Sequence, residues 1–169
     1  MPIGDNMLPS ADELLSAIRC GRTDGAPLRE WAWQLAVLYR DLIVDARERT
    51  GIRAGISGIV HDIDSWLAGQ LPNTRCGPVK GTESLGSVVA RLAEAQVVAC
   101  WELTRLPAGD DRVHRAWVQL AELRDGYDDL VPVVASGRID LPRSWRGIDD
   151  AEREFNDPDY RNRARRERR

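Results

Sequence analysis

The stretch IRAGISGIVHDIDSWLAGQ, residues 52–70, decides the fold class of this 169-residue chain. When its side chains are placed at about 100° per residue around a helix, the large apolar ones fall into one narrow sector. His61 points almost directly away from that sector, so we expect it to be solvated. The segment therefore predicts an amphipathic helix that buries one face. The apolar sector consists of Ile52, Ile56, Ile59, Ile63 and Trp66, with Val60 and Leu67 beside it.

Three further segments, 27–49, 83–104 and 111–136, show the same helical periodicity. Breaks rich in Gly and Pro precede the segments at 27, 83 and 111, and we see no internal repeat and no sustained strand alternation. The connection between the segments 27–49 and 52–70 is very short, which is typical of antiparallel neighbours. The sequence thus predicts an all-α fold, specifically an antiparallel four-helix bundle.

Local residues predict where two of the helices begin and end. Ser10 and Glu13 have the spacing of a capping box, which predicts a short N-terminal helix ahead of the four long ones. Pro27 suits the first turn of the next helix, where its missing N–H costs nothing. We expect that helix to run to Thr50, with Gly51 as its C-terminal cap.

Charge divides the chain into two unequal parts. The net charge of −3 argues against bulk electrostatic binding to nucleic acid. Residues 160–169, however, hold six Arg and one Glu, so this tail carries +5 and the remainder carries −8. We predict one helical bundle domain over 7–142 and a charged, partly disordered C-terminal extension over 143–169.

The chain begins without a basic and then apolar leader, and no apolar run approaches the roughly 20 residues that cross a bilayer. Its three cysteines, Cys20, Cys76 and Cys100, cannot all pair with one another, and their spacing suits no zinc site. We therefore expect a cytoplasmic protein with no membrane association and no metal or other cofactor.

Polar residues interrupt the predicted apolar faces at Asp45, Arg49, Gln96, Arg124 and Asp128. A buried, unpaired charge costs several kcal/mol, so such groups need partners. Spacing of four residues allows Asp45–Arg49 and Arg124–Asp128 pairs, with Gln96 as a neutral bridge between them. One interpretation is a salt-bridge network that fixes helix register, and another is a pocket in which the two arginines hold a small anionic ligand. A third is that the helical phase is wrong and these residues are exposed.

A second apolar patch lies opposite the main faces of two helices. Trp33, Val37 and Val44 form it on one helix, and Val97 and Trp101 repeat it on another. Either the N-terminal helix and the C-terminal segment cover this patch, or a partner subunit does. These five residues are therefore candidates for contacts with a partner protein or within a homodimer.

Catalytic chemistry finds little support in the sequence. Neither of the two His residues lies on a predicted core face, so no base is available to activate Ser or Cys. A magnesium-dependent nucleotide pyrophosphohydrolase of all-α type needs paired carboxylates on helices. Asp45 with Glu48, and Glu122, Asp125 and Asp128, have usable spacing, but a solvated helix face also explains them. We therefore favour a non-enzymatic protein and keep this hydrolase as an alternative.

The basic tail raises a further alternative, which is weak binding to nucleic acid through phosphate contacts. Beyond Tyr160 the tail has no interleaved aromatic residues, so base stacking is not indicated. We favour instead a solubilising arm, or one that folds back on the acidic body. The candidate contacts are Arg161, Arg163, Arg165, Arg166, Arg168 and Arg169.

Several stretches between residues 7 and 142 share a pattern of helix-core residues. They are MLPSADELL (7–15), IDSWLA (63–68), SVVARLA (87–93), WVQLAEL (117–123), YDDL (127–130) and LP (141–142). Together they resemble a functionally uncharacterised family of small helical proteins from high-GC bacteria and their viruses, which carries only a domain-of-unknown-function label. The resemblance implies an α-helical bundle and cytoplasmic residence, and it supplies no catalytic residues. It places Asp64, Trp66, Tyr127 and Asp128 within the matching pattern.

We therefore expect a helical-bundle protein that acts by binding, without catalytic chemistry and without a cofactor. Its expected partner is a second copy of the chain, another protein or a small anionic ligand.

Overall fold

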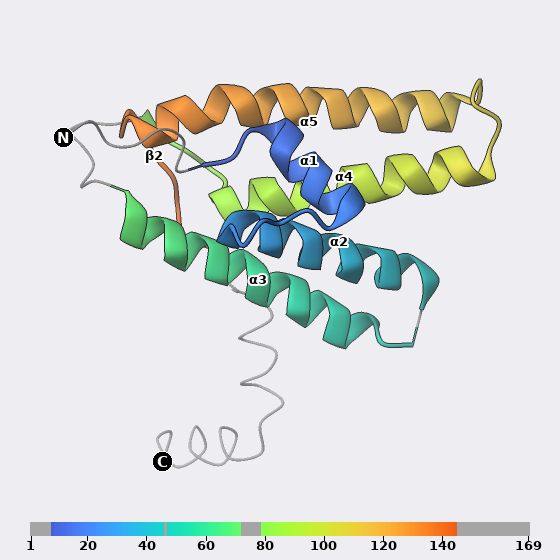
Figure 1. Ribbon diagram of the computed structural model, residues 1–169, viewed down its shortest axis with the longest axis horizontal. Coiled ribbons are helices and arrows are strands. Elements are labelled where there is room, and N and C mark those ends of the chain that lie inside the picture. The colour runs from blue at the N-terminus through green and yellow to red at the C-terminus, as the bar shows by residue number, and fades with distance from the viewer. Residues whose placement is uncertain (1–7, 46, 72–78, 145–169) are drawn as a thin grey trace, which may run out of the picture.

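The computed structural model describes residues 8–45, 47–71 and 79–144 (Figure 1). Within these ranges the chain forms five helices and two strands of two residues each, so the predicted all-α class is confirmed in its broad form. The elements are α1 (Ala11–Cys20), α2 (Pro27–Val44), α3 (Arg49–Gln70), β1 (Val79–Lys80), α4 (Leu85–Arg105), α5 (Asp111–Ala135) and β2 (Ile139–Asp140).

The four long helices run back and forth (Figure 1). α2 and α3 point in opposite directions, as do α4 and α5, and a short connection joins each pair. α2 and α4 contact one another and run in the same direction. The short helix α1 lies against α2, α4 and α5, so it closes one side of the molecule.

The predicted C-terminal end of the second helix was wrong. α2 ends at Val44, and Asp45 has extended backbone angles instead of helical ones. The Asp45 carboxylate accepts the N–H of Arg47 at 2.8 Å, a local side-chain bond that competes with continued helix formation. Thr50 and Gly51 therefore belong to the first turn of α3.

The capping box at the start of α1 is confirmed. The Ser10 hydroxyl accepts the N–H of Glu13 at 3.3 Å, and the Glu13 carboxylate accepts the N–H of Ser10 at 2.8 Å. The hydrogen bonds that the Glu13 carboxylate accepts from the N–H and the hydroxyl of Ser10 lower its pKa, and its ion pair with Arg29 acts in the same direction. At the other end, Gly21 caps α1 in the left-handed conformation, with φ of 66°, which Gly adopts without steric cost.

The two strands were not predicted. They pair in parallel, with Val79 opposite Ile139 and Lys80 opposite Asp140. A salt bridge between Lys80 and Asp140 accompanies this pairing. The strands hold the chain before α4 beside the chain after α5.

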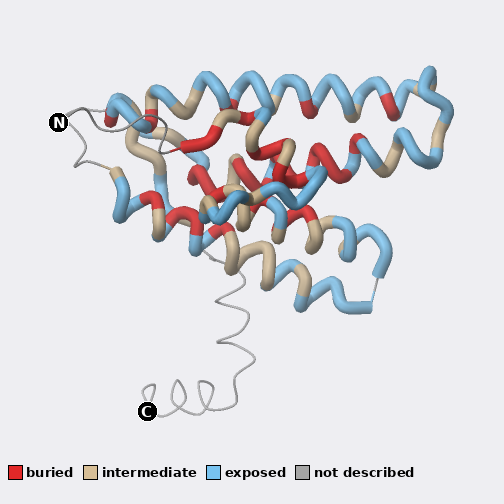
Figure 2. Tube along the Cα trace, in the orientation of Figure 1, coloured by how far each residue is buried: buried red, intermediate tan, exposed pale blue. Residues whose placement is uncertain are grey.

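The core lies where α1 crosses the long helices, and Figure 2 shows the buried residues gathered there. As expected, His61 is exposed, whereas Ile63 and Leu67 on the opposite face of α3 are buried. Val60 is buried as well, whereas Ile52, Ile56, Ile59 and Trp66 are only half buried. The largest fully buried side chains include Leu14, Ile18, Leu35, Leu92 and Tyr127.

Asp64 is the one carboxylate among the buried residues of the described chain, with 5% of its surface exposed. One oxygen accepts the N–H of Gly86 in the first turn of α4 at 2.7 Å, and the other accepts the N–H of Ser144 at 2.9 Å. Charge-assisted bonds to backbone N–H groups offset the cost of burying a carboxylate, and the N-terminus of α4 favours a negative charge. Asp64 thereby fastens α3 both to α4 and to the chain that follows α5.

Gly86 lies at a close approach between α3 and α4. A Cβ atom at this position would collide with the carbonyl oxygen of Val60 and would lie 3.0 Å from the Asp64 carboxylate. Both neighbours are held in place, one as helix backbone and the other by its hydrogen bonds. Only glycine therefore fits between these two helices at this level.

We expect Gly86→Ala to lower the free energy of unfolding by about 1–3 kcal/mol, because the helices must separate to admit a methyl group. Gly126→Ala on α5 is the matched control, since nothing lies within 4 Å of its added Cβ. That control should raise the stability by about 0.5–1 kcal/mol through helix propensity alone. Urea denaturation of the two variants measures both values, and a similar change in each would contradict the close approach.

Candidate functional site

A groove opens between the end of α1 and the C-terminal halves of α2 and α4. Its volume is about 520 Å³, within the range of small-molecule sites. Apolar side chains dominate its wall. The residues that α2 contributes lie within about one helical turn, and those that α4 contributes lie within about two turns. The lining residues are Arg19, Arg40, Ile43, Val44, Gln96, Val97, Cys100, Trp101 and Thr104.

Gln96 is the buried polar residue of this groove, with 2% of its surface exposed. Its side-chain amide donates to the sulfur of Cys100 at 2.9 Å. Its oxygen, Oε1, is fully buried and has no hydrogen-bond partner among the described residues. A buried acceptor without a donor costs about 1–3 kcal/mol, so this atom requires an explanation that the helix packing does not give.

The charges around the groove are all of one sign. Arg19 at the end of α1 and Arg40 on α2 line it, and its described lining includes no Asp or Glu. Arg40 also donates to the carbonyl oxygen of Ile18 at 2.7 Å. This bond satisfies a carbonyl at the end of α1 and fixes the position of the guanidinium.

Trp101, the aromatic residue of the groove wall, is in contact with Arg105, which is not itself a lining residue. The guanidinium of Arg105 lies 4.8 Å from the ring centre of Trp101, a cation–π distance. Trp101 is half buried, and its neighbour one turn earlier, Val97, is buried. α4 therefore forms an apolar side of the groove.

The five polar residues predicted to converge do not form one cluster. Asp45 and Arg49 are exposed at the turn between α2 and α3, and Asp45 bonds to the backbone of that turn. Of the five, only Gln96 lines the groove. The predicted phase failed for Asp45 because the helix ends one residue before it.

Arg124 and Asp128 instead anchor the N-terminus of α1. Asp128 accepts the N–H of Ala11 at 2.7 Å, and Arg124 donates to the Asp12 carboxylate at 3.0 and 3.2 Å. Between them on α5, the hydroxyl of buried Tyr127 donates to the carbonyl oxygen of Pro9 at 2.9 Å. We call Arg124, Tyr127 and Asp128 the α1 anchor.

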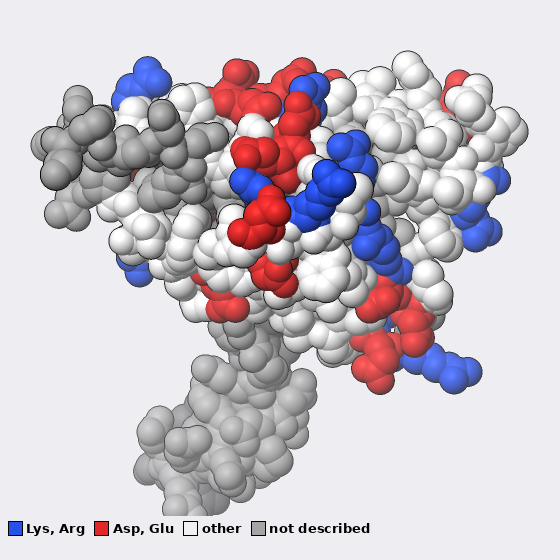
Figure 3. All heavy atoms as spheres, viewed as in Figure 1, with Lys and Arg blue, Asp and Glu red and all other residues white. Residues whose placement is uncertain are grey.

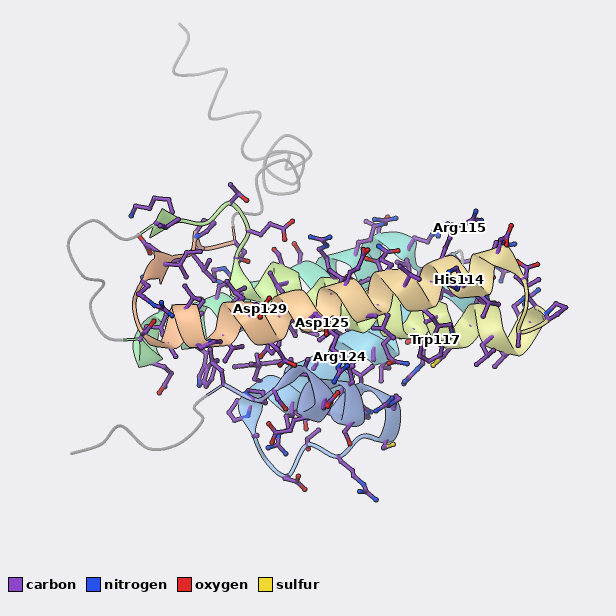
Figure 4. The ribbon with its side chains drawn as sticks, turned by 90° about the horizontal axis from the view of Figure 1, so that it is seen from above. His114, Arg115, Trp117, Arg124, Asp125 and Asp129 are labelled. Atoms are coloured by element: carbon purple, nitrogen blue, oxygen red, sulfur yellow. The ribbon has the colours of Figure 1, made fainter. Side chains whose placement is uncertain are left out.

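The α1 anchor uses one side of α5. Figure 4 shows Arg124 on the side that faces α1, whereas Asp125 and Asp129 lie along the outer ridge of the helix. Arg124 and Asp128 therefore bond to α1, and neither the predicted Arg124–Asp128 pair nor a contact with the Asp45–Arg49 turn is among the described ion pairs and hydrogen bonds. These residues have a structural role in the described chain.

The predicted partner-contact residues divide between two places. Val44, Val97 and Trp101 line the groove. Trp33 and Val37 come earlier in α2 and are not among the lining residues. The Trp33 ring lies close to Gly21 at the end of α1. Val44 is 72% exposed, and Figure 3 shows mostly uncharged surface over the far ends of α4 and α5. α1 therefore covers only part of the predicted apolar patch.

Several other predictions lie beyond what the structure tests. The six Arg candidates for nucleic-acid contact lie outside the described residues, as does Cys76. Within the described ranges, no three His, Cys, Asp or Glu side chains gather as a metal site. No helix in those ranges combines the length and apolarity that a membrane span requires.

Sequence reasoning missed Arg19, Arg40 and Asp64 as residues of special position. Arg40 could have been found, because it lies between Val37 and Val44 on the second apolar face of α2. The position of Arg19 depends on how α1 docks and has no signal in the sequence. The predicted apolar face of α3 contains Ile63 and Leu67 but gave no reason to expect a carboxylate between them.

Tyr127→Phe tests the α1 anchor. Removing the hydroxyl leaves the buried Pro9 carbonyl without its donor, so we expect a loss of about 1–3 kcal/mol in unfolding free energy at neutral pH. Burial, helped by Asp128 and Glu13, raises the pKa of Tyr127 above its ordinary value. The unfolded phenol ionises near pH 10 while the folded one stays protonated, so wild-type stability falls as the pH rises above about 10.

The free energy of unfolding of Tyr127→Phe, measured by urea denaturation, should therefore fall less steeply than that of the wild type as the pH rises above about 10. Tyr39→Phe is the comparison, because burial also raises the pKa of Tyr39, to about 12, but Tyr39 is not in the α1 anchor. Unchanged neutral stability of Tyr127→Phe would contradict the role of this hydrogen bond.

No family model, no curated protein and no solved structure matches this chain in the comparisons with known proteins.

Proposed function

We propose that this chain is a binding protein without catalytic chemistry and that it holds a small molecule with an apolar body in the α1/α2/α4 groove. The observation that carries the proposal is the buried Oε1 of Gln96, which lacks a partner in an otherwise apolar wall. The overall arrangement that we propose for the bundle is the antiparallel four-helix one, with α1 as an added cover.

The groove has the properties expected of a ligand site and not of a packing defect. Its volume of about 520 Å³ exceeds what a few ordered waters occupy. Its wall combines apolar side chains with a small number of polar groups that can orient a ligand. A bound molecule with a hydrogen-bond donor would both cover the exposed apolar surface of Val44 and satisfy Gln96.

The hydrolase alternative receives no comparable support from the described residues. Glu122, Asp125 and Asp128 are exposed on α5, and Asp128 already accepts a backbone N–H of α1. Asp45 and Glu48 lie at the other end of the molecule, in the turn before α3. The paired carboxylates required for a magnesium site therefore remain apart.

A neutral fluorescent probe, N-phenyl-1-naphthylamine, tests the site. We expect saturable binding at one site per chain, with transfer of excitation from Trp101. Cys100→Trp fills the groove from an exposed position and should weaken binding at least about tenfold, because the added ring occupies the ligand's volume. Val98→Trp is the matched control, since Val98 is an exposed residue of α4 outside the groove lining.

Absence of saturable binding, or equal weakening by both variants, would overturn the proposal. Sedimentation of the same samples tests the competing possibility that a second copy of the chain covers this surface. If the chain forms a dimer that Cys100→Trp disrupts, and the probe does not bind, the groove is an interface with a second copy.

A further inference from the structure

The groove has its two arginines and Gln96 toward one end. Beyond them its lining is apolar except for Thr104, whose hydroxyl donates to the carbonyl oxygen of Trp101. α2 and α4 run side by side in the same direction (Figure 1), so lining residues that come early in each helix lie toward the same end. Arg40 and Gln96 come first, and Arg19 joins them because the end of α1 contacts Arg40. Ile43, Val44 and Trp101 follow about one turn later.

The polar end favours an anion. Arg19 and Arg40 line it and no carboxylate is among its described lining residues. Each guanidinium has five N–H donors in a planar fork, which suits the two oxygens of a carboxylate. Arg40 uses one of its groups on the carbonyl of Ile18, so this guanidinium is positioned before a ligand arrives.

Gln96 adds a requirement that a simple carboxylate does not meet. Its buried Oε1 accepts hydrogen bonds, as do both oxygens of a carboxylate, so the two cannot bond to one another. We assign the donor that Oε1 lacks to a hydroxyl or N–H group of the ligand, which bonds to Oε1 when the Gln96 amide turns toward the groove. Because Gln96 and Arg40 belong to the same end of the groove, that donor lies near the carboxylate.

We propose that the groove selects an amphiphilic carboxylate with a hydrogen-bond donor beside the acid group, for which a 3-hydroxy acid with an apolar tail is the simplest example. Arg19 and Arg40 bind the carboxylate, Gln96 accepts from the hydroxyl, and Ile43, Val44 and Trp101 contact the tail. This ligand class rests on the binding function proposed above for the same groove.

Displacement of N-phenyl-1-naphthylamine by three matched compounds tests the ligand class: 1-decanol, decanoate and 3-hydroxydecanoate. For the wild-type chain we expect decanoate to bind about tenfold more tightly than decanol, as a charge-assisted bond implies. The hydroxy acid should bind a further three- to tenfold more tightly, in keeping with about one neutral hydrogen bond.

Two variants assign the preferences to their residues. Arg19→Gln should reduce the preference for decanoate over decanol, whereas Arg22→Gln, which removes the same charge outside the groove lining, should leave it unchanged. Gln96→Leu should abolish the preference for the hydroxy acid over decanoate while retaining the preference for acid over alcohol. Circular dichroism and the thermal midpoint confirm that each variant is folded.

The outcomes separate this inference from the proposed function. If the probe binds in the groove but decanol competes as well as decanoate, or Gln96→Leu keeps the hydroxyl preference, the ligand class is wrong and the binding function stands. If the probe does not bind to the wild-type chain, the binding function itself fails.

Discussion

The hydrogen bonds of buried Asp64 are the interaction on which the arrangement of the long helices depends. A single carboxylate on α3 accepts one N–H from the start of α4 and another from Ser144, beyond the end of α5. Burying an unpaired carboxylate would cost several kcal/mol, so both partners must stay in place. Gly86 makes this geometry attainable, because its missing side chain lets the backbone of α4 approach that of α3.

The same requirement explains the α1 anchor at the other side of the molecule. Arg124, Tyr127 and Asp128 interrupt or flank the apolar face of α5, and each has its partner at or just before the first turn of α1. Asp128 and the Ser10–Glu13 capping box together satisfy N–H groups that a helix start leaves unpaired. Polar residues within an apolar face here specify where a short helix docks.

The position of α1 in turn determines the groove. Its N-terminus is fixed by α5, and its last turn supplies Arg19 and the carbonyl of Ile18 that holds Arg40. The proposed ligand end of the groove is thus assembled from three helices that are brought together by contacts elsewhere. Among the described residues Arg29, Gln96 and Ser144 each have a buried side-chain atom without a hydrogen-bond partner, and Gln96 is the one of these three that lines the groove. That difference is what makes the groove a candidate site.

The sequence by itself determined the helices, because apolar periodicity and local caps act within a few residues. It predicted the capping box of α1 and the exposure of His61, and it placed Gln96, which is buried, on an apolar face. The assignment of faces failed at Asp45, where a local side-chain bond ends α2. Only the tertiary structure decided which polar residues meet. Arg124 pairs with a residue that lies 112 positions away, and Asp64 with residues 22 and 80 positions away. Such pairings depend on how the helices cross, and the helical period of one segment carries no information about its distance or rotation relative to another.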